Sequence, residues 1–211
     1  MHLRVLTWNL KHGRSVPPSQ RELLDEFGAA LHSWEWDVAL LQEVPPWWPE
    51  PLARATHADF RAVRTSRNFG LAVRRAIATR HPDLIKSNGG GANAILVRGE
   101  IRDHRAQRLC RLPERRWAQG VQLADGSWAV NLHASNTRNA LRDTQKAARG
   151  PWGSPLLFGG DTNVTHPQLP GLVHLGGNHV DHLFSDGRPA TRVEVLERGT
   201  LSDHAPVRVT L

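Results

Sequence analysis

Apolar and polar residues alternate along this chain in short runs, a pattern that favours β-strands over most of its length. Apolar runs at 3–8, 38–41 and 156–158 each lead directly into a polar group, which places that group at a strand end. Similar runs predict further strands at 61–65, 69–73, 92–98, 104–110, 117–124, 127–133, 180–185, 192–197 and 205–211. Residues 124–127 read Ala-Asp-Gly-Ser and predict a hairpin turn.

Helical spacing of apolar residues occurs in fewer places. The predicted helices are residues 23–34, a short segment ending near 57, and residues 138–149. Ser19 and Glu22 predict a capping box before the first helix, and Thr137 is the expected cap of the last. The glycine-rich stretch 74–91 predicts a mobile loop. Many strands with few helices favour a strand-rich α/β protein over a doubly wound parallel sheet.

The composition indicates one soluble domain, residues 1–211, with a substantial core. No apolar run approaches the ~20 residues that a membrane span needs. The first strand begins directly after Met1 and His2, which leaves no room for a signal peptide. Cys110 is the single cysteine, so no intramolecular disulfide can form. We expect a cytoplasmic protein, and the sequence leaves its oligomeric state open.

The positive charge is concentrated in the middle of the chain. Residues 60–116 contain fourteen Lys and Arg against four Asp and Glu, whereas the rest contains thirteen against sixteen. Arginine's planar fork suits bidentate contacts with phosphate, so this segment is a candidate nucleic-acid-binding region. The same excess is expected from a solvated, arginine-rich surface or from the composition of the genome, and this alternative stays open.

Polar groups at four strand ends carry the candidate chemistry. They are Thr7-Trp8-Asn9, Gln42-Glu43, Gly159 to Asn163, and Asp203-His204, the last just before the terminal strand. Carboxylate and amide oxygens are the ligands that Mg²⁺ prefers. Oxygen ligands and a histidine gathered from several strand ends therefore indicate a magnesium-assisted hydrolase of phosphate esters.

Seven motifs occur in one order along the chain: TWNL (7–10), LLQEV (40–44), GANAILVR (91–98), VNLHASN (130–136), GGDTNV (159–164), VDHLFSD (180–186) and LSDHAPV (201–207). In these motifs the whole chain resembles the endonuclease/exonuclease/phosphatase superfamily. That superfamily includes deoxyribonucleases, abasic-site endonucleases, inositol polyphosphate phosphatases and neutral sphingomyelinases. The resemblance implies two packed β-sheets flanked by helices, a four-layer α/β sandwich, with the site at one end.

The resemblance also implies a metal site for Mg²⁺, with Mn²⁺ as a substitute. Glu43 matches the principal magnesium-binding glutamate, Asn9 matches an asparagine that touches the metal or its water shell, and Asp203 would lie near that shell. Some members have an acid where this chain has Lys11. The loss of that ligand favours a single ion held mainly by Glu43.

Catalytic roles follow from the same matches. Asp161 would orient or deprotonate the attacking water, and the Asn163 amide would donate to a phosphate oxygen. His204 would act as a base or stabilise the phosphate, with Asp181 fixing its tautomer and Asp203 beside it. The site offers no dedicated base to a serine or cysteine, so water is the expected nucleophile.

Four further residues are implied to contact the substrate. His133 would contact the scissile phosphate or protonate the leaving oxygen. Asn136, Asn93 and Arg116 are candidate phosphate contacts. Abasic endonucleases have a tyrosine at the position of His133, and this chain contains no tyrosine, which disfavours that activity.

The other ten histidines, among them His12, His166 and His182, are expected at the surface or packed in the fold. His182 should face the side of its strand opposite to Asp181, because successive strand residues alternate.

Three functions agree with the sequence. The first is a divalent-metal-dependent phosphodiester hydrolase acting on nucleic acid. The second is a phosphatase or phosphodiesterase for a small phosphorylated molecule or lipid headgroup, favoured by the absence of long insertions. The third is an inactive binding protein on the same scaffold. The presence of Glu43, Asp161 and His204 disfavours the third.

Overall fold

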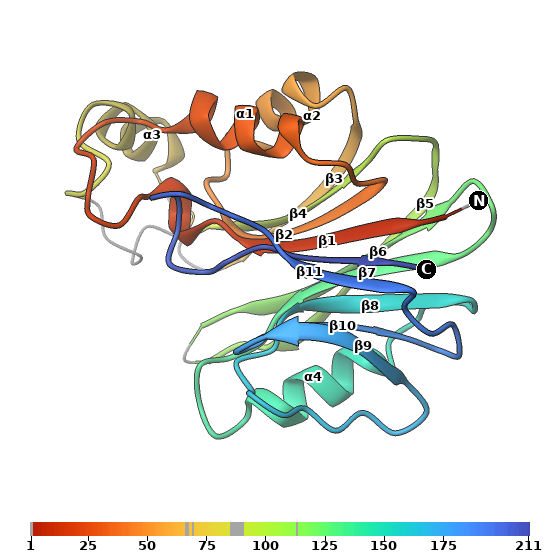
Figure 1. The fold of residues 1–211 in the computed structure, drawn as a ribbon. Helices are drawn as coiled ribbons and strands as arrows, with labels where there is room; N and C mark the ends of the chain where they lie inside the picture. Colours follow the sequence, from red (N-terminus) through yellow and green to blue (C-terminus); the bar gives the residue numbers. More distant parts are fainter. Residues whose placement is uncertain (1, 66–67, 69, 85–90, 113) are drawn as a thin grey trace.

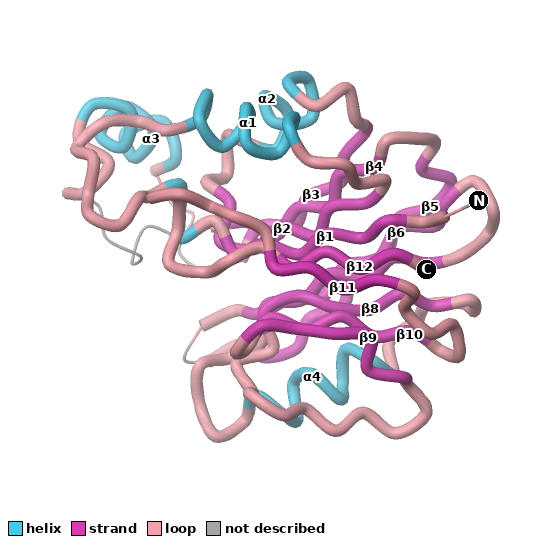
Figure 2. Tube along the Cα trace, viewed as in Figure 1, coloured by secondary structure: helices cyan, strands magenta, loops and turns pink. Residues whose placement is uncertain are grey.

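The strands form two six-stranded mixed sheets, as the sequence predicts (Figures 1 and 2). The structure is a computed structural model that describes residues 2–65, 68, 70–84, 91–112 and 114–211. The first sheet has the order β11 (Arg192–Val195), β12 (Val207–Thr210), β1 (Arg4–Asn9), β2 (Val38–Val44), β4 (Ala92–Val97), β3 (Asp59–Arg64). The second has the order β5 (Ile101–Cys110), β6 (Arg116–Leu123), β7 (Trp128–His133), β8 (Leu156–Asp161), β10 (Asp181–Ser185), β9 (Val173–Asn178).

Helices cover the outer faces of both sheets. The helices are α1 (Leu24–Ser33), α2 (Pro49–Ala55), α3 (Leu71–Arg80) and α4 (Ala140–Ala148), with a short 3-10 turn η1 (Lys11–Gly13) after β1. Helices α1 and α2 pack on the first sheet through Phe27, Leu31 and Leu52, and α4 packs on the second through Ala147. The expected four-layer α/β sandwich is confirmed.

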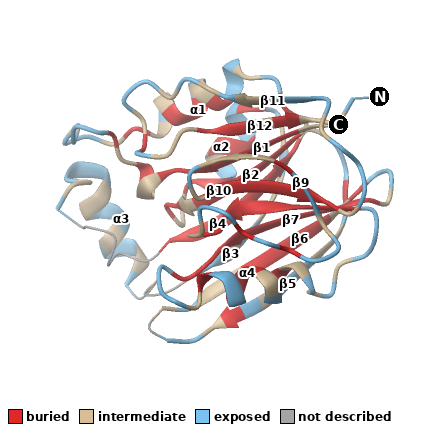
Figure 3. Ribbon diagram, turned by 60° about the horizontal axis from the view of Figure 1, so that its bottom comes forward, coloured by how far each residue is buried: buried red, intermediate tan, exposed pale blue. Residues whose placement is uncertain are grey.

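The apolar core between the sheets explains the alternation in the sequence. Leu40 and Ile95 of the first sheet pack against Val121, Ala129 and Leu157 of the second. In Figure 3 the buried strands fill the middle of the molecule, whereas α3 has no buried residue. No helix in the described part of the chain is long and apolar enough to cross a membrane.

Each sheet contains one parallel pair of strands, and these pairs position the site. Strands β1 and β2 run parallel with Asn9 opposite Gln42, and β7 and β8 run parallel with His133 opposite Asp161. The carboxyl ends of parallel strands lie at the same edge of a sheet. Strand β10 runs antiparallel to β8 and begins at Asp181, directly opposite Asp161.

Three local predictions are wrong. The predicted strand 69–73 is not formed, because residues 71–73 begin helix α3; residue 69 lies outside the described residues. Helix α3 also occupies part of the predicted mobile loop 74–91, of which 85–90 lie outside the described residues. The capping box is absent, since α1 begins at Leu24 with no side-chain cap.

Other boundaries agree closely with expectation. The hairpin at 124–127 forms, with Leu123 N–H donating to Ser127 O and Gly126 N–H donating to Leu123 O. Helix α4 begins at Ala140, three residues after Thr137, whose hydroxyl oxygen accepts from Asn139 N–H. Strand β9 is not predicted, because its sequence VHLGGN lacks apolar alternation.

Candidate active site

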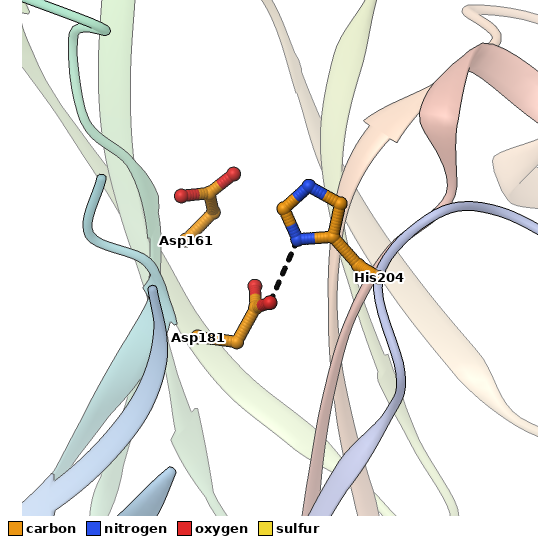
Figure 4. A group of neighbouring side chains, drawn as sticks. All are labelled: Asp161, Asp181 and His204. Atoms are coloured by element: carbon orange, nitrogen blue, oxygen red, sulfur yellow. Dashed lines mark hydrogen bonds and ion pairs between the residues drawn. The ribbon is translucent and has the colours of Figure 1, made fainter. Parts of the chain in front are cut away.

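The predicted catalytic residues converge at one end of the sandwich, between the two sheets. Figure 4 shows Asp161, Asp181 and His204 pointing toward one another. One ligand atom from each lies within 4.8 Å of those of the other two. Asp161 ends β8 and Asp181 begins β10, so the sheet itself brings the two carboxylates together. His204 reaches them from the loop before β12, on the first sheet.

The Asp181–His204 pair has the geometry that the sequence predicts. His204 Nδ1 donates to Asp181 Oδ2 at 2.7 Å, and Asp181 is 2% exposed. The His204 backbone is fixed as well, because its carbonyl accepts from Trp8 Nε1 at 2.9 Å and its N–H donates to Ser202 Oγ. Burial opposes charge on His204, but the hydrogen bond and charge of Asp181 raise its pKa to about 9.

Asp161 is buried among groups that fix both of its oxygens. Asn9 Nδ2 donates to Oδ2 at 2.9 Å, which joins β1 of one sheet to β8 of the other. Asn163 N–H donates to Oδ1 at 3.0 Å. Burial, followed by the charge of Asp181, raises the pKa of Asp161 to about 7. Asn163 uses its side-chain amide to donate to Ala134 O at 3.0 Å.

Arg116 determines which nitrogen of His133 carries the proton. Arg116 Nη1 donates to His133 Nδ1 at 2.8 Å. A guanidinium can only donate, so Nδ1 is the acceptor and Nε2 carries the hydrogen. Burial, reinforced by the charge of Arg116, lowers the pKa of His133 well below its usual value. Its neutral ring points Nε2 toward Asp161 Oδ2 at 3.4 Å and Glu43 Oε1 at 3.8 Å.

Glu43 reaches this cluster because β2 is irregular. The register of β2 against β4 shifts between Leu41 and Val44, and Glu43 has a φ of 50°. Such a bulge re-aims side chains next to it. Gln42 consequently points between the sheets, where it donates to Asn131 Oδ1, while the Glu43 carboxylate faces His133.

Sequence reasoning missed His12, which it placed at the surface or in the packed fold. His12 Nε2 lies 3.1 Å from Glu43 Oε2. Lys11 and His12 both have positive φ, in the turn that follows β1, and this turn directs the ring to the site. The only sequence feature that could have indicated His12 was its position three residues after Asn9. Strand periodicity gives no direction for a side chain in such a turn.

Of the remaining predicted residues, Asp203 adjoins the cluster, with its Oδ1 3.9 Å from His204 Nε2. Asp203 is half exposed, and Lys11 Nζ donates to it at 2.7 Å. Burial opposes the shift, but the hydrogen bond and charge of Lys11 lower the pKa of Asp203. Asn136 is exposed after β7. Asn93 is fully buried, and its Nδ2 donates to Trp117 O, a contact that links the two sheets.

The donor set fits a hard divalent cation. Two buried carboxylates, Asp161 and Asp181, face the same space, and Asp181 Oδ1 has no hydrogen-bond donor. A cation offsets the repulsion of such paired charges and satisfies the orphaned oxygen. The converging trio of Asp161, Asp181 and His204 differs from the predicted metal set of Asn9, Glu43 and Asp203. Glu43 adjoins the trio by its contact with His133, and Asn9 adjoins it by its hydrogen bond to Asp161.

Comparison with known proteins gives a consistent result. The model of the "Endonuclease/Exonuclease/phosphatase family" matches residues 6–204. A comparison with curated proteins found no match.

Solved structures share the fold. An endonuclease/exonuclease/phosphatase from Beutenbergia cavernae is 17% identical, with a TM-score of 0.75, covering 99% of this chain and 71% of that one. A humanized TDP2 of D. rerio is 17% identical, with a TM-score of 0.71 and coverage of 99% and 98%. A mannosyl-6-phosphatase of Bacteroides thetaiotaomicron is 17% identical, with a TM-score of 0.69 and coverage of 99% of both chains. The family model spans both sheets and all of the residues in the cluster, and the chain therefore belongs to the endonuclease/exonuclease/phosphatase family.

Proposed function

We propose that this protein is a divalent-metal-dependent phosphodiesterase that cleaves nucleic acid. The observation that carries the proposal is the convergence of Asp161, Asp181 and His204, flanked by His133 and Glu43, at the end of the sandwich. Two carboxylates, a charged histidine and a neutral histidine donor together supply proton transfer and phosphate stabilisation.

A basic helix at the same end supports a polyanionic substrate. The basic segment 60–116 is spread over several strands, but α3 presents Arg75 and Arg80 on an exposed surface. The segment after α3 contacts the stretch that follows β1, since Arg14 Nη2 donates to Pro82 O and Gln20 N–H donates to Asp83 Oδ2. Figure 1 shows α3 beside that end of the sheets.

The residues of the site have distinct tasks in this proposal. Asp161 orients the attacking water and accepts its proton, and its burial, which raises its pKa, favours that role. His204, with a pKa of about 9, is charged at neutral pH and stabilises negative charge on the phosphate. His133 directs Nε2–H into the same space and donates to a phosphate or leaving oxygen.

Two candidate nucleophiles in the described part of the chain, Ser202 and Cys110, are poorly placed to replace water. Ser202 is completely buried, and its hydroxyl donates to Asn9 O at 2.6 Å. Burial raises the pKa of the Cys110 thiol, and Cys110 lies on β5, outside the cluster. A direct attack of water on phosphorus, without a covalent intermediate, therefore fits the site.

Mg²⁺ or Mn²⁺ would be held by Glu43 and Asn9 together with the oxygens of the acidic cluster. Bound there, the cation neutralises charge on the phosphate and lowers the pKa of water. The chain's own contribution is to fix these oxygens. Asn9 bridges the backbone N–H of Lys11 and the Asp161 carboxylate, and the bulge in β2 aims Glu43.

A phosphatase for a small phosphorylated molecule is the second candidate. The similarity in fold to the Bacteroides mannosyl-6-phosphatase, which aligns over 99% of both chains, supports it as an analogy. A small substrate would use the same cluster without α3.

One panel of substrates separates the candidates. Supercoiled plasmid, single-stranded DNA, RNA, a bis-nitrophenyl phosphate diester and a sugar phosphate are incubated with Mg²⁺, Mn²⁺ or EDTA. A Glu43→Gln preparation, purified identically, controls for contaminating nucleases. Metal-dependent cleavage of nucleic acid supports the proposal, and turnover of the small esters alone supports the second candidate. Silence on every substrate overturns both and favours a binding protein.

A further inference from the structure

A second cluster of histidines lies on the outer face of the second sheet, behind the active site. A pocket of about 600 Å³ opens there, between β9, β10 and the loop that follows Asn163. Four of its lining residues are His166, His174, His179 and His182. His182 follows Asp181 in β10 and faces away from the active site, as strand alternation predicts.

His182 is fixed in one tautomer. Its side chain is buried, and Nε2 lies 3.0 Å from both Val164 O and His179 O. Carbonyl oxygens only accept, so Nε2 carries the hydrogen and the lone pair remains on Nδ1. Histidines that bind metals commonly donate their other ring N–H to a backbone carbonyl, which holds the free nitrogen toward the ion.

The Nδ1 lone pair of His182 accepts a hydrogen bond from a second imidazole. Its Nδ1 lies 3.1 Å from His174 Nε2, and the ring centroids are 5.1 Å apart. Two imidazoles bound to one Zn²⁺ at about 2.0–2.1 Å, in tetrahedral geometry, place their nitrogens about 3.3–3.4 Å apart. The observed separation needs only a small rotation of the exposed His174 ring to reach that value.

The backbone opposite His182 passes close to its ring. Gly177 pairs with His182 across the sheet, and a Cβ at this position would lie 2.2 Å from His182 Nδ1. Any residue other than glycine would therefore clash with that ring. His166 and His179 line the same pocket and are exposed, and their rings would have to turn toward the pair to act as further ligands.

We propose that His174 and His182, with His166 and His179 around them, form a second metal site, for Zn²⁺ or a similar transition-metal ion. The donors are imidazoles, and the residues that line the pocket include no carboxylate. Imidazole suits Zn²⁺, Cu²⁺ and Ni²⁺, whereas Mg²⁺ prefers oxygen. The site is thus chemically different from the oxygen-rich cluster on the other face of β10.

Metal titration of the full chain, purified without a polyhistidine tag and stripped with EDTA, tests the site. Zn²⁺ affinity is measured by competition with a chromophoric chelator in excess Mg²⁺, and Co²⁺ is used to record the visible absorption of imidazole-ligated metal. His174→Ala is the central variant, because its exposed side chain can be removed without affecting the core. His182→Asn is the second variant, and circular dichroism checks that it folds.

Two control variants test whether a loss of Zn²⁺ binding is specific to the proposed site. His57→Ala removes one member of a surface pair, His32 and His57, whose ring centroids are 5.9 Å apart. His204→Ala disrupts the active-site cluster. We expect one Zn²⁺ in the wild type, in His57→Ala and in His204→Ala, and at least a tenfold weaker affinity with loss of the Co²⁺ spectrum in His174→Ala. Unchanged binding in His174→Ala, or loss of the ion in His204→Ala alone, overturns the proposal.

Discussion

Hydrogen bonds decide the protonation state of each histidine in the active site. Asp181 accepts from His204 Nδ1 and favours its charged form, while Arg116 donates to His133 Nδ1 and favours its neutral form. The two rings therefore differ in charge, although both face Asp161. One is suited to stabilise an anion and the other to donate a hydrogen bond.

Glu43→Gln is expected to lower metal-dependent hydrolysis at least about 100-fold while the fold remains intact. The amide keeps the shape of the side chain but removes the charge that holds a hard cation. The rate with saturating Mg²⁺ measures activity, and thermal unfolding measures stability. Turnover equal to that of the wild type would contradict the assignment of Glu43 to the metal.

His12→Ala should raise the Mg²⁺ concentration for half-maximal activity about tenfold, with a smaller loss of the rate at saturation. The reason is that His12 Nε2 contacts Glu43 Oε2 and restricts its orientation. A Mg²⁺ titration of the initial rate measures the shift, with His57→Ala as the matched control. An unchanged Mg²⁺ requirement would show that the contact does not position Glu43.

The residue types at the strand ends could be predicted, because each follows a recognisable apolar run. The structure brings Asp161, Asp181, His133 and His204 together, as this reasoning and the resemblance predict, and their catalytic roles stay predictions. The approach of His12 could not be predicted, because it depends on a left-handed turn. The location of Asn93 inside the sandwich depends on which face of β4 meets the second sheet. Every residue of β4 is buried, so its sequence does not distinguish the two faces.

At the scale of elements, strands with clear alternation were predicted within a few residues. Helix α3 was not, because its apolar residues do not form one buried stripe and none of them is buried. Strand β9 was missed for a related reason, since its two glycines and its histidine carry no period. Contacts with adjacent segments stabilise both elements more than the apolar pattern of their own sequences does. A short stretch of sequence does not reveal such contacts.

Replacing Arg74, Arg75 and Arg80 with Ala should weaken binding to long nucleic acid and flatten its salt dependence, because fewer counterions are released. Turnover of a small diester should change little. Binding measured at several salt concentrations checks this, with Arg142→Ala on α4 and Arg149→Ala directly after α4 as the control pair. Equal losses with both substrates would mean that these arginines support the site or the fold.

At the scale of the whole molecule, buried amides join the two sheets. Asn131 of β7 donates to Leu41 O at 2.8 Å and to Ala94 O at 2.9 Å, both on the first sheet, and accepts from Gln42 Nε2 at 2.7 Å. Gly160 lies beside this group with a φ of 132°, where a Cβ would meet Leu132 O at 2.1 Å. Directional bonds of this kind set the relative position of two sheets that apolar packing alone would leave free to slide.

Asn131→Ala is expected to destabilise the protein by about 2–4 kcal/mol, because two buried carbonyls lose the donor that Asn131 supplies and the buried Gln42 amide loses one of its acceptors. Urea unfolding measures the change. Asn139→Ala is the control, since the Asn139 side chain makes no capping hydrogen bond and its loss should cost less than about 0.5 kcal/mol. A cost for Asn131→Ala as small as that of the control would remove the inter-sheet role.

The active site draws its groups from both sheets: Asn9 and Glu43 from the first, and His133, Asp161 and Asp181 from the second. A cation bound there would connect the two sheets. The unfolded chain does not bring these groups together and would not bind the cation in this way. Because the ion binds only the folded chain, its binding stabilises the protein against thermal unfolding. The free energy of unfolding rises by about 2.7 kcal/mol when the ion concentration is a hundred times the dissociation constant. Melting curves should shift upward with Mg²⁺ in the wild type and hardly at all in Glu43→Gln. A protein whose Tm ignores Mg²⁺ would not hold its ion across the sandwich.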